Sequence, residues 1–452
     1  MRTFAFALIL CFTGTLFAVE PLTPKDALAT FKTLKGFKVE LVACEPNVID
    51  PVSMCFDEKG RLWVCELRGY PNGGVAKGEM KPSMLRLLTD ADGDGFYEKS
   101  SEVHKLRCPT GVMPWRDNLL LANAPTVTML KANGEEHVLY ENFGLDNIQQ
   151  VVNSLQFGLD NWVYGVAGNN GGTIRNPHDP KQATVSLRGR GIRFRPDEPA
   201  SLEATSGGGQ YGLTCDEFQH WFTSTNSQHL RQIVLPDQYL RRNPYLTVPA
   251  VTFDIPEHGA ACKLFRISPF EEWRVERTTR RKDSPEAKRF SPTELVPGGF
   301  VTSACSPVCY TADLFPKEFR NSVFVCDPAN NLITRDLLEP NGSLYKAKRA
   351  DAEQEFLAST DNWFRPVHLS IGPDGALYVL DFYRETIETP ISLPEDIKKK
   401  LNLESRAKGR IWRIVPEGHK HAPLPTLDKA NTSELVRALT HANPWHRYTA
   451  QR

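Results

Sequence analysis

The stretch 371–379, Ile-Gly-Pro-Asp-Gly-Ala-Leu-Tyr-Val, decides the fold of this chain because it recurs along the sequence. It consists of an apolar residue, a short turn with Asp and Gly, and an apolar run that carries an aromatic residue. Clear copies stand at 56–64 and 157–165, and weaker copies stand at 113–121 and 215–223. The Asp, Asn and Gly residues suit the positive-φ positions of a turn, so each copy predicts an antiparallel hairpin.

The repeat has the length expected for one small sheet in a ring of sheets. Anchor residues of the second strand recur roughly every 45–60 residues, or at about twice that interval where a copy is too divergent to see. These anchors are Trp63, Leu120, Tyr164, Phe222, Phe324 and Tyr378. A four-stranded blade with its loops needs about that length, whereas the repeats of a β-helix are much shorter. The sequence therefore predicts an all-β fold, a β-propeller over residues 30–416, with six blades favoured and seven possible.

Composition excludes some functions. The 452 residues include Lys+Arg 54 and Asp+Glu 54, so there is no electrostatic reason to expect a nucleic acid as partner. A hydrophobic content of 40% is ordinary for a globular protein.

The N-terminus predicts export. Arg2 precedes an apolar run over 4–17, and Ala18 offers a small residue for cleavage, so residues 1–18 are interpreted as a signal peptide. The alternative is a membrane anchor, but the run is short for a span, and no later segment approaches ~18 uninterrupted apolar residues. We expect a protein of the periplasm or cell envelope with no transmembrane span after removal of the signal.

Export makes disulfides possible. Nine cysteines remain after loss of Cys11, and an odd number leaves at least one thiol free or paired between chains. Cys305 and Cys309 are the nearest pair and the favoured disulfide. The sequence contains neither C-x-x-C nor C-x-x-C-H, so it predicts neither a zinc ribbon nor a covalent c-type haem.

The character of the sequence changes after the propeller. Residues 417–430 are rich in Pro, His and Lys and are predicted to be a linker, and residues 431–452 have the apolar stripe of a short α-helical segment. One such helical hairpin cannot bury its own apolar face. It therefore either packs on the propeller or begins an array of helical repeats.

Several stretches carry a family resemblance, among them 36–46, 207–212, 225–229, 299–305 and 381–385. Over roughly residues 30–415 the chain resembles the membrane-bound dehydrogenase-type propellers, large exported proteins of planctomycetes and their relatives. The resemblance implies kinship with soluble glucose/sorbosone dehydrogenases, which use pyrroloquinoline quinone. In that family HEAT-like repeats often follow the propeller, and the C-terminal segment of this chain resembles the start of the first such repeat.

The resemblance implies an oxidoreductase that acts on a sugar or alcohol and passes electrons to an acceptor such as a c-type cytochrome. Such a reaction needs a general base for the hydroxyl proton and cations for the carboxylates of the cofactor. In glucose/sorbosone dehydrogenases the base is a His about seven residues before the phrase that begins here at Phe157. This chain has Gln150 at that position, and glutamine cannot act as the base. The alternative is a non-catalytic propeller that binds a carbohydrate or another ligand, or serves as a scaffold.

Candidate site residues are polar groups at strand ends and in Gly-rich loops, where propellers place central sites. Candidate catalytic residues are His229, Arg365 and Asp381, and candidate cofactor-binding residues are Glu66, Gln210, Asn226, Asp327 and Arg384. A weaker third idea is lactonase-like hydrolysis, with Glu66, Asn226 and Asp327 around a cation. The basic run over 277–282 is most simply a solvated loop.

The sharpest local motif is the acidic stretch 90–98, Asp-Ala-Asp-Gly-Asp-Gly-Phe-Tyr-Glu. Alternating carboxylates on a tight turn are typical of Ca²⁺ loops, and the second Gly permits the turn. Ser101 replaces the usual twelfth-position Glu, so Asp90, Asp92, Asp94 and Glu98 are predicted to hold a structural Ca²⁺. The alternative is a solvated acidic turn.

Overall fold

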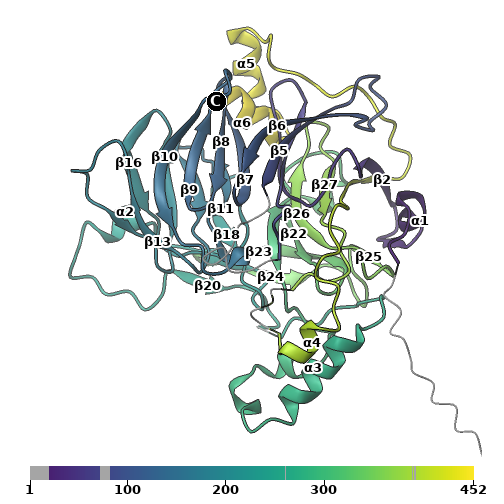
Figure 1. The fold of residues 1–452 in the computed structure, drawn as a ribbon. Helices are drawn as coiled ribbons and strands as arrows, with labels where there is room; N and C mark the ends of the chain where they lie inside the picture. Colours follow the sequence, from purple (N-terminus) through teal and green to yellow (C-terminus); the bar gives the residue numbers. More distant parts are fainter. Residues whose placement is uncertain (1–19, 72–81, 260, 389, 391–392) are drawn as a thin grey trace, which may run out of the picture.

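The computed structural model describes residues 20–71, 82–259, 261–388, 390 and 393–452. The expected signal peptide lies outside the described residues. Six sheets form a ring, with short helices at both ends of the ring (Figure 1). Within the described residues no helix is long and apolar enough to cross a membrane. The predicted six-bladed β-propeller is confirmed.

The first three blades run from the inner strand outward in chain order. Blade one contains β3 (Pro51–Phe56), β4 (Leu62–Glu66), β5 (Ser83–Thr89) and β6 (Lys99–Leu106). Blade two contains β7 (Pro109–Trp115), β8 (Asn118–Asn123), β9 (Thr126–Leu130) and β10 (Glu136–Phe143), extended by β13 (Gly172–Arg175) and β14 (Val185–Ser186). Blade three contains β11 (Asn153–Phe157), β12 (Val163–Val166), β15 (Gly191–Arg195) and β16 (Glu198–Ala204).

Among the remaining three blades, the fifth and sixth also include the N-terminal strands. Blade four contains β17 (Leu213–Cys215), β18 (Trp221–Thr223), β19 (Arg231–Ile233) and β20 (Thr252–Asp254). Blade five contains β21 (Cys305–Cys309), β22 (Ser322–Asp327), β23 (Leu332–Asn341), β24 (Leu344–Arg349), β25 (Leu357–Ser359) and β1 (Phe31–Thr33). Blade six contains β26 (Pro366–Ile371), β27 (Leu377–Asp381), β28 (Arg410–Pro416) and, outermost, β2 (Phe37–Cys44). Because β2 pairs with β28, the two ends of the propeller sequence close one sheet.

The repeated phrase is the turn between the first and second strands of each blade. One residue with positive φ stands just before every second strand, and these residues are Gly60, Arg116, Asn161, Gln219, Asn321 and Gly375. In the clear copies an Asp of the turn accepts a hydrogen bond from a backbone N–H two residues later, as Asp374 does from Ala376 at 3.1 Å. The same carboxylate accepts the hydroxyl of Tyr378, the anchor of the next strand, at 3.1 Å.

The long interval between Phe222 and Phe324 holds an insertion rather than a seventh blade. Each of the six anchors lies on the second strand of its own blade, so in the described part of the chain no anchor is left over. The insertion carries α3 (Glu272–Lys282), η2 (Ala287–Arg289) and η3 (Pro292–Leu295). The basic run is therefore the last part of a helix, and its interpretation as a loop was wrong.

Different helices occupy the two ends of the ring (Figure 1). α3 and α4 (Glu395–Lys398) lie at one end, and α5 (Thr432–Ala438) and α6 (Pro444–Gln451) lie at the other. Short helices elsewhere are α1 (Pro24–Leu28), η1 (Ile148–Gln150), α2 (Asp237–Leu240) and η4 (Lys317–Phe319). Asn443, just before α6, donates to the carbonyls of Gly372 and Pro373 in the repeated turn, both at 2.9 Å. The C-terminal segment thus packs on the propeller, and its HEAT-like character stays a prediction.

The favoured disulfide does not form. All nine described cysteines are free. Cys305 and Cys309 begin and end β21, and four residues of extended strand span ~13 Å. Disulfide-linked Cα atoms lie about 4.4–6.8 Å apart, so two cysteines at the ends of one strand cannot be joined.

Candidate functional site

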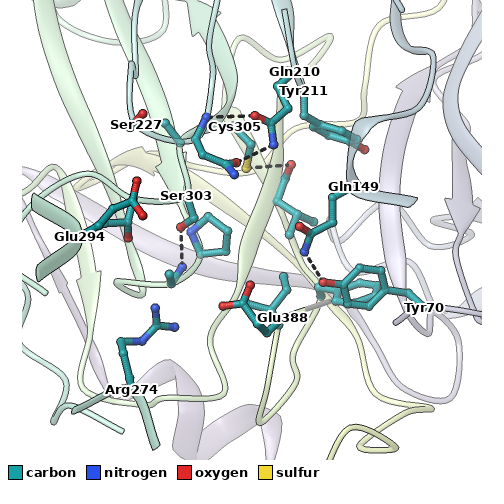
Figure 2. Close-up of a pocket in the computed structure, with 18 of the residues that line it drawn as sticks. Tyr70, Gln149, Gln210, Tyr211, Ser227, Arg274, Glu294, Ser303, Cys305 and Glu388 are labelled. Atoms are coloured by element: carbon teal, nitrogen blue, oxygen red, sulfur yellow. Dashed lines mark hydrogen bonds between the residues drawn. The ribbon is translucent and has the colours of Figure 1, made fainter. Parts of the chain in front are cut away.

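A cavity of about 330 Å³ lies at the α3 end of the propeller channel (Figure 2). Val52, Thr110, Cys305 and Val367 line it near the starts of the inner strands of blades one, two, five and six. Residues of α3 and of the segment around η3 also line it. The central position and mixed polar and apolar lining are typical of a small-molecule site. We call it the α3 cavity.

Three arginines of α3 line the cavity: Arg274, Arg277 and Arg281. Their spacing of three and four residues places them on one face of the helix. Arg277 donates to Glu388 at 3.0 Å, and Arg281 lies 3.5 Å from Glu294. The Nε of Arg277 is buried and has no hydrogen-bond partner among the described residues. A buried N–H without a partner costs about 1–3 kcal/mol, so this donor is favourably placed for an acceptor brought by a ligand.

Next to these arginines, Glu271 is a buried carboxylate shared by three guanidinium groups. Arg266, Arg274 and Arg365 lie 2.9, 3.3 and 3.1 Å from its oxygens. Burial alone would raise the pKa of Glu271, but the three arginines hold it well below its usual range. The pKa values of Arg266 and Arg365 are lowered, first by burial and also by repulsion from Arg274.

This end of the channel therefore has more guanidinium groups than carboxylates in its ion pairs. Five arginines pair with three glutamates, namely Arg266, Arg274, Arg277, Arg281 and Arg365 with Glu271, Glu294 and Glu388. Arginine presents paired N–H donors that match carboxylate and phosphate oxygens. A partly buried cluster with an excess of guanidinium groups favours an anionic ligand.

Amide and hydroxyl groups lie across the cavity from Arg274 (Figure 2). Gln149 donates to the hydroxyl of Tyr70 at 2.5 Å. Gln210 donates to the side-chain oxygen of Asn226 at 2.7 Å and accepts from the backbone N–H of Asn226 at 3.3 Å. Amides offer both donors and acceptors, so this wall suits the hydroxyl groups of a sugar or alcohol. Of the predicted cofactor-binding residues, Gln210 and Asn226 line the cavity.

Three of the predicted site residues, Glu66, Asp327 and Asp381, are carboxylates at strand ends. All three accept hydrogen bonds from neighbouring protein groups, and none lines the cavity. Glu66 accepts from Arg86 at 2.6 Å and from Arg68 at 2.5 Å. Asp327 accepts from the hydroxyl of Ser303 at 2.5 Å and from backbone N–H groups on both sides. Glu66, Asn226 and Asp327 thus do not converge on a cation as the lactonase idea needs.

Asp381 has the pKa of a general base but not its position. Burial raises the pKa of Asp381 to about 7, against the effect of its N–H donors. Its carboxylate accepts from the backbone of Arg365 at 2.8 Å, the backbone of Tyr383 at 3.0 Å and the indole of Trp412 at 3.0 Å. The group is wrapped by these donors and does not line the α3 cavity.

The two arginines among the predicted site residues, Arg365 and Arg384, are buried and hydrogen-bonded to other parts of the protein. Arg365 pairs with Glu271 and donates to the carbonyls of Pro328 and Arg384 at 2.9 and 3.0 Å. Arg384 pairs with Asp50 at 2.8 Å. Both side chains are about 1% exposed or less, so neither reaches into the cavity as a free ligand contact.

The predicted histidine base is absent from the cavity. His229 is buried and does not line it, and its Nε2–H donates to Asp336 at 3.0 Å. It is therefore not placed to take a proton from a ligand in the cavity. Gln150 is the last residue of η1 and does not line the cavity. The other two residues of η1, Ile148 and Gln149, do line it. None of the described lining residues is a histidine.

The acidic loop brings three of its four predicted ligands together. Carboxylate oxygens of Asp90, Asp92 and Glu98 lie within 4.8 Å of one another. Asp94 instead accepts from the backbone N–H of Phe96 at 2.7 Å. Calcium at this loop stays a prediction.

The arginines of α3 line the cavity but were not among the candidate residues predicted from the sequence. Their signal is present in the sequence, because Arg274, Arg277 and Arg281 follow a helical spacing and Trp273 supplies an apolar anchor that is 8% exposed. The charge of the basic run 277–282 does not by itself indicate a helix, because a helix is recognised from the periodic spacing of its residues.

The fold and the site together define a six-bladed propeller with a cationic central cavity. The chain belongs to the DUF7133 family, a domain of unknown function, whose model matches residues 23–418. No curated protein matches the sequence.

Solved structures with a similar fold include several sugar dehydrogenases. A glucose dehydrogenase-type oxidoreductase from Thermus thermophilus is 16% identical, with a TM-score of 0.46, over 84% of this chain and 100% of that chain. The PQQ domain of pyranose dehydrogenase from Coprinopsis cinerea is 14% identical, with a TM-score of 0.43, over 85% of this chain and 97% of that chain. A luciferin-regenerating enzyme is 8% identical, also with a TM-score of 0.43, over 86% and 99%. At these identities no residue role is transferred.

Proposed function

We propose that the α3 cavity binds a multiply charged anionic cofactor, pyrroloquinoline quinone, and that the protein is an oxidoreductase that acts on a sugar or alcohol. The observation that carries the proposal is the set of five arginines that share three glutamates. The buried, unpartnered Nε of Arg277 adds a donor on the cavity wall.

The residues present fit the cofactor in its charge. Arg274, Arg277 and Arg281 would hold its carboxylates, because guanidinium groups bind carboxylates through charge-assisted hydrogen bonds. When bound, such a quinone supplies a hydride acceptor that no amino-acid side chain provides. Gln149, Gln210 and Asn226 would orient a hydroxylated substrate against it through amide donors and acceptors.

The proton of the substrate hydroxyl needs an acceptor within the cavity. Glu388 and Glu294 are the carboxylates that line it. We assign the role of base to Glu388, since Arg277 fixes its carboxylate at 3.0 Å, whereas Glu294 pairs more loosely with Arg281 at 3.5 Å. This assignment replaces the histidine that the family resemblance implies at Gln150.

Export to the periplasm or cell envelope is part of the proposal, and it rests on the apolar N-terminal run. The resemblance to membrane-bound dehydrogenase-type propellers also implies that the electrons pass to a c-type cytochrome.

A second candidate function is the binding of an acidic carbohydrate without redox chemistry. It is favoured by the amide wall and by the fact that both lining glutamates are already ion-paired. The same arginines would then hold the carboxylate or sulfate of the sugar.

Titration with pyrroloquinoline quinone, followed by dye reduction across a panel of sugars and alcohols, separates the two functions. The proposal expects saturable quinone binding and turnover of at least one substrate. The variant Glu388→Gln frees Arg277, so it is expected to keep or strengthen quinone affinity but to lose ~10²–10⁴ of turnover, the range typical for general-base catalysis. Absence of quinone binding, or undiminished turnover in Glu388→Gln, would overturn the proposed mechanism.

A further inference from the structure

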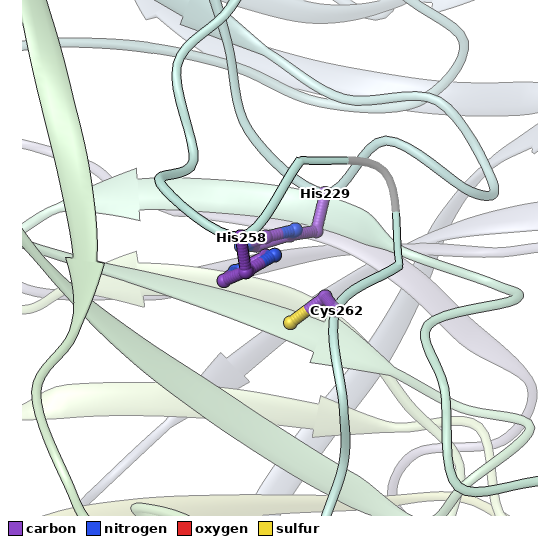
Figure 3. A group of neighbouring side chains, drawn as sticks. All are labelled: His229, His258 and Cys262. Atoms are coloured by element: carbon purple, nitrogen blue, oxygen red, sulfur yellow. The ribbon is translucent and has the colours of Figure 1, made fainter.

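A second cluster of reactive side chains lies away from the α3 cavity, at the junction of blades four and five (Figure 3). His229 precedes β19, and His258 and Cys262 follow β20. One ligand atom of each lies within 4.8 Å of the other two. The exposed fractions of His229 and Cys262 are 1% and 0%, so the cluster is secluded from solvent on two sides.

Hydrogen bonds fix which nitrogen of each ring is free to bind. The Nε2–H of His229 donates to Asp336 Oδ2 at 3.0 Å, which leaves Nδ1 with the lone pair. The Nδ1–H of His258 donates to the carbonyl of Gly259 at 2.9 Å, which leaves Nε2 with the lone pair. That Nε2 is buried and has no hydrogen-bond partner among the described residues. Two imidazoles each held by an acceptor on the far nitrogen are the usual arrangement of metal-binding histidines.

We propose that His229 Nδ1, His258 Nε2 and Cys262 Sγ bind one borderline-soft transition-metal ion of the Zn²⁺ class. Imidazole nitrogen and thiolate sulfur are the ligands that such ions prefer over Ca²⁺ or Mg²⁺. Asp336 has the role of the outer carboxylate that orients a ligating histidine. Three protein ligands leave one position of a tetrahedral ion for water.

The charges around the cluster fit a divalent ion. Arg349 is already paired with Glu355 at 2.6 Å, so this pair is neutral by itself. Asp336 and the thiolate of Cys262 then balance the two charges of the ion. Metal binding displaces the remaining protons from such ligands.

The same residues could also be a nucleophile, base and acid in the order Cys262, His229 and Asp336. Access decides between the two interpretations. The sulfur belongs to a residue with 0% exposure, so a substrate carbonyl cannot approach it, whereas a bare ion can enter past the partly exposed His258. The ion would join the segment before β19 to the connection that follows β20, and the hydrogen bond from His229 to Asp336 would link it to β23 of blade five.

The test is a titration of the chelator-treated, full-length protein with Co²⁺, followed by competition with Zn²⁺. We expect one ion per chain, a thiolate-to-cobalt charge-transfer band in the near ultraviolet, loss of that band on addition of Zn²⁺, and a higher Tm with metal. Cobalt at the acidic loop 90–98 cannot give this band because that loop has no sulfur. Absence of the band in the folded wild-type protein overturns the proposal.

Variants assign the ligands. Cys262→Ser is expected to abolish the band, and Asp336→Asn to weaken Co²⁺ binding by ~10–100-fold, the usual effect of losing an outer partner. His258→Gln alters a partly exposed residue, so it keeps the test valid if Cys262→Ser fails to fold. Cys108→Ser, which alters another thiol with 0% exposure, is the matched control and should bind as the wild type does. An unchanged band in His258→Gln, or alkylation of Cys262 by iodoacetamide that added Zn²⁺ does not slow, would contradict the metal site.

Discussion

Blade one and the α3 end of the channel both contain partly buried arginine–glutamate networks, but the two networks differ in their balance of charge. In blade one, Arg68 and Arg86 share Glu66 and Glu102, so two cations meet two anions. The network around α3 joins five arginines to three glutamates. Buried ions are costly unless they are paired. A network with equal numbers of cations and anions needs no further partner. A network with an excess of cations beside a cavity favours the binding of an anionic ligand.

The two networks also differ in whether the N–H donors of their arginines have hydrogen-bond partners. Arg86 donates to Glu66, Glu102 and the hydroxyl of Ser100. Arg277 donates to Glu388 but has a buried Nε without a partner among the described residues. Glu66, a candidate site residue from the sequence, thus has a structural role in a network whose charges and donors are paired.

The largest expected effect is on folding stability in the α3 network. Glu271→Gln leaves three guanidinium groups without their shared carboxylate and should lower the free energy of unfolding by roughly 3–5 kcal/mol at pH 7. Because the pKa of Glu271 is lowered in the folded state, its contribution is present above the unfolded pKa of about 4.3 and is lost as the pH falls below that value.

Urea denaturation of wild type and Glu271→Gln at pH 7 and near pH 3.5 measures this contribution. The difference between the two proteins should shrink at the lower pH. An equal difference at both pH values would contradict the role of the ionised carboxylate.

A slightly smaller loss of stability is expected in blade one. Arg86→Met removes one partner of the buried Glu66 but leaves Arg68, so we expect a loss of roughly 3 kcal/mol, at the lower end for a broken buried pair. The folded variant should bind quinone as the wild type does. Weaker quinone binding in folded Arg86→Met would break the division between a structural and a ligand-binding network.

The reverse pattern is expected for Arg277→Met. Loss of a charge-assisted contact of about 1.5–3 kcal/mol should weaken quinone binding by ~10–100-fold. The loss of stability should be smaller than in Arg86→Met, because the side chain of Glu388 is 19% exposed and that of Glu66 is 0% exposed. Isothermal titration calorimetry measures the affinity. Arg280→Met is the matched control, because Arg280 is on the same helix but pairs with Glu276 and Asp396 at the surface. Equal losses of affinity in both variants would show that only the general charge of α3 matters.

The smallest effect has the opposite sign. Glu294→Gln removes the partner that lies 3.5 Å from Arg281, and both side chains are partly exposed. Freeing this guanidinium should strengthen quinone binding by about two- to fivefold, in line with the ~0.2–1 kcal/mol of an exposed ion pair. The same titration checks it, and a weakened affinity would mean that Glu294 itself contacts the ligand.

The fold was predictable from the sequence because one local rule repeats in every blade. The turn before each second strand needs a positive-φ residue, and Gly60 and Gly375 show this openly, while Arg116 and Gln219 meet it without any sequence signal. Blade five has its turn at Asn321, after an insertion that conceals the repeat. The count of six therefore followed from the anchors on the second strands rather than from the turns.

The site was less predictable because it depends on contacts between distant segments. Gln210 and Asn226 were found from their loops, but Arg274 and Arg277 come from an insertion whose position over the channel no local pattern encodes. Glu66 ends a strand, as a candidate site residue should, yet Arg86, twenty positions later, donates to its carboxylate. Pairing of this kind is a property of the folded chain.

The most direct test of the central claim is a crystal structure of the protein with pyrroloquinoline quinone. We expect the cofactor in the α3 cavity, with its carboxylates on Arg274, Arg277 and Arg281 and with the Nε of Arg277 donating to it. A cofactor bound elsewhere on the propeller, or an empty α3 cavity at a quinone concentration that saturates binding in solution, would contradict it.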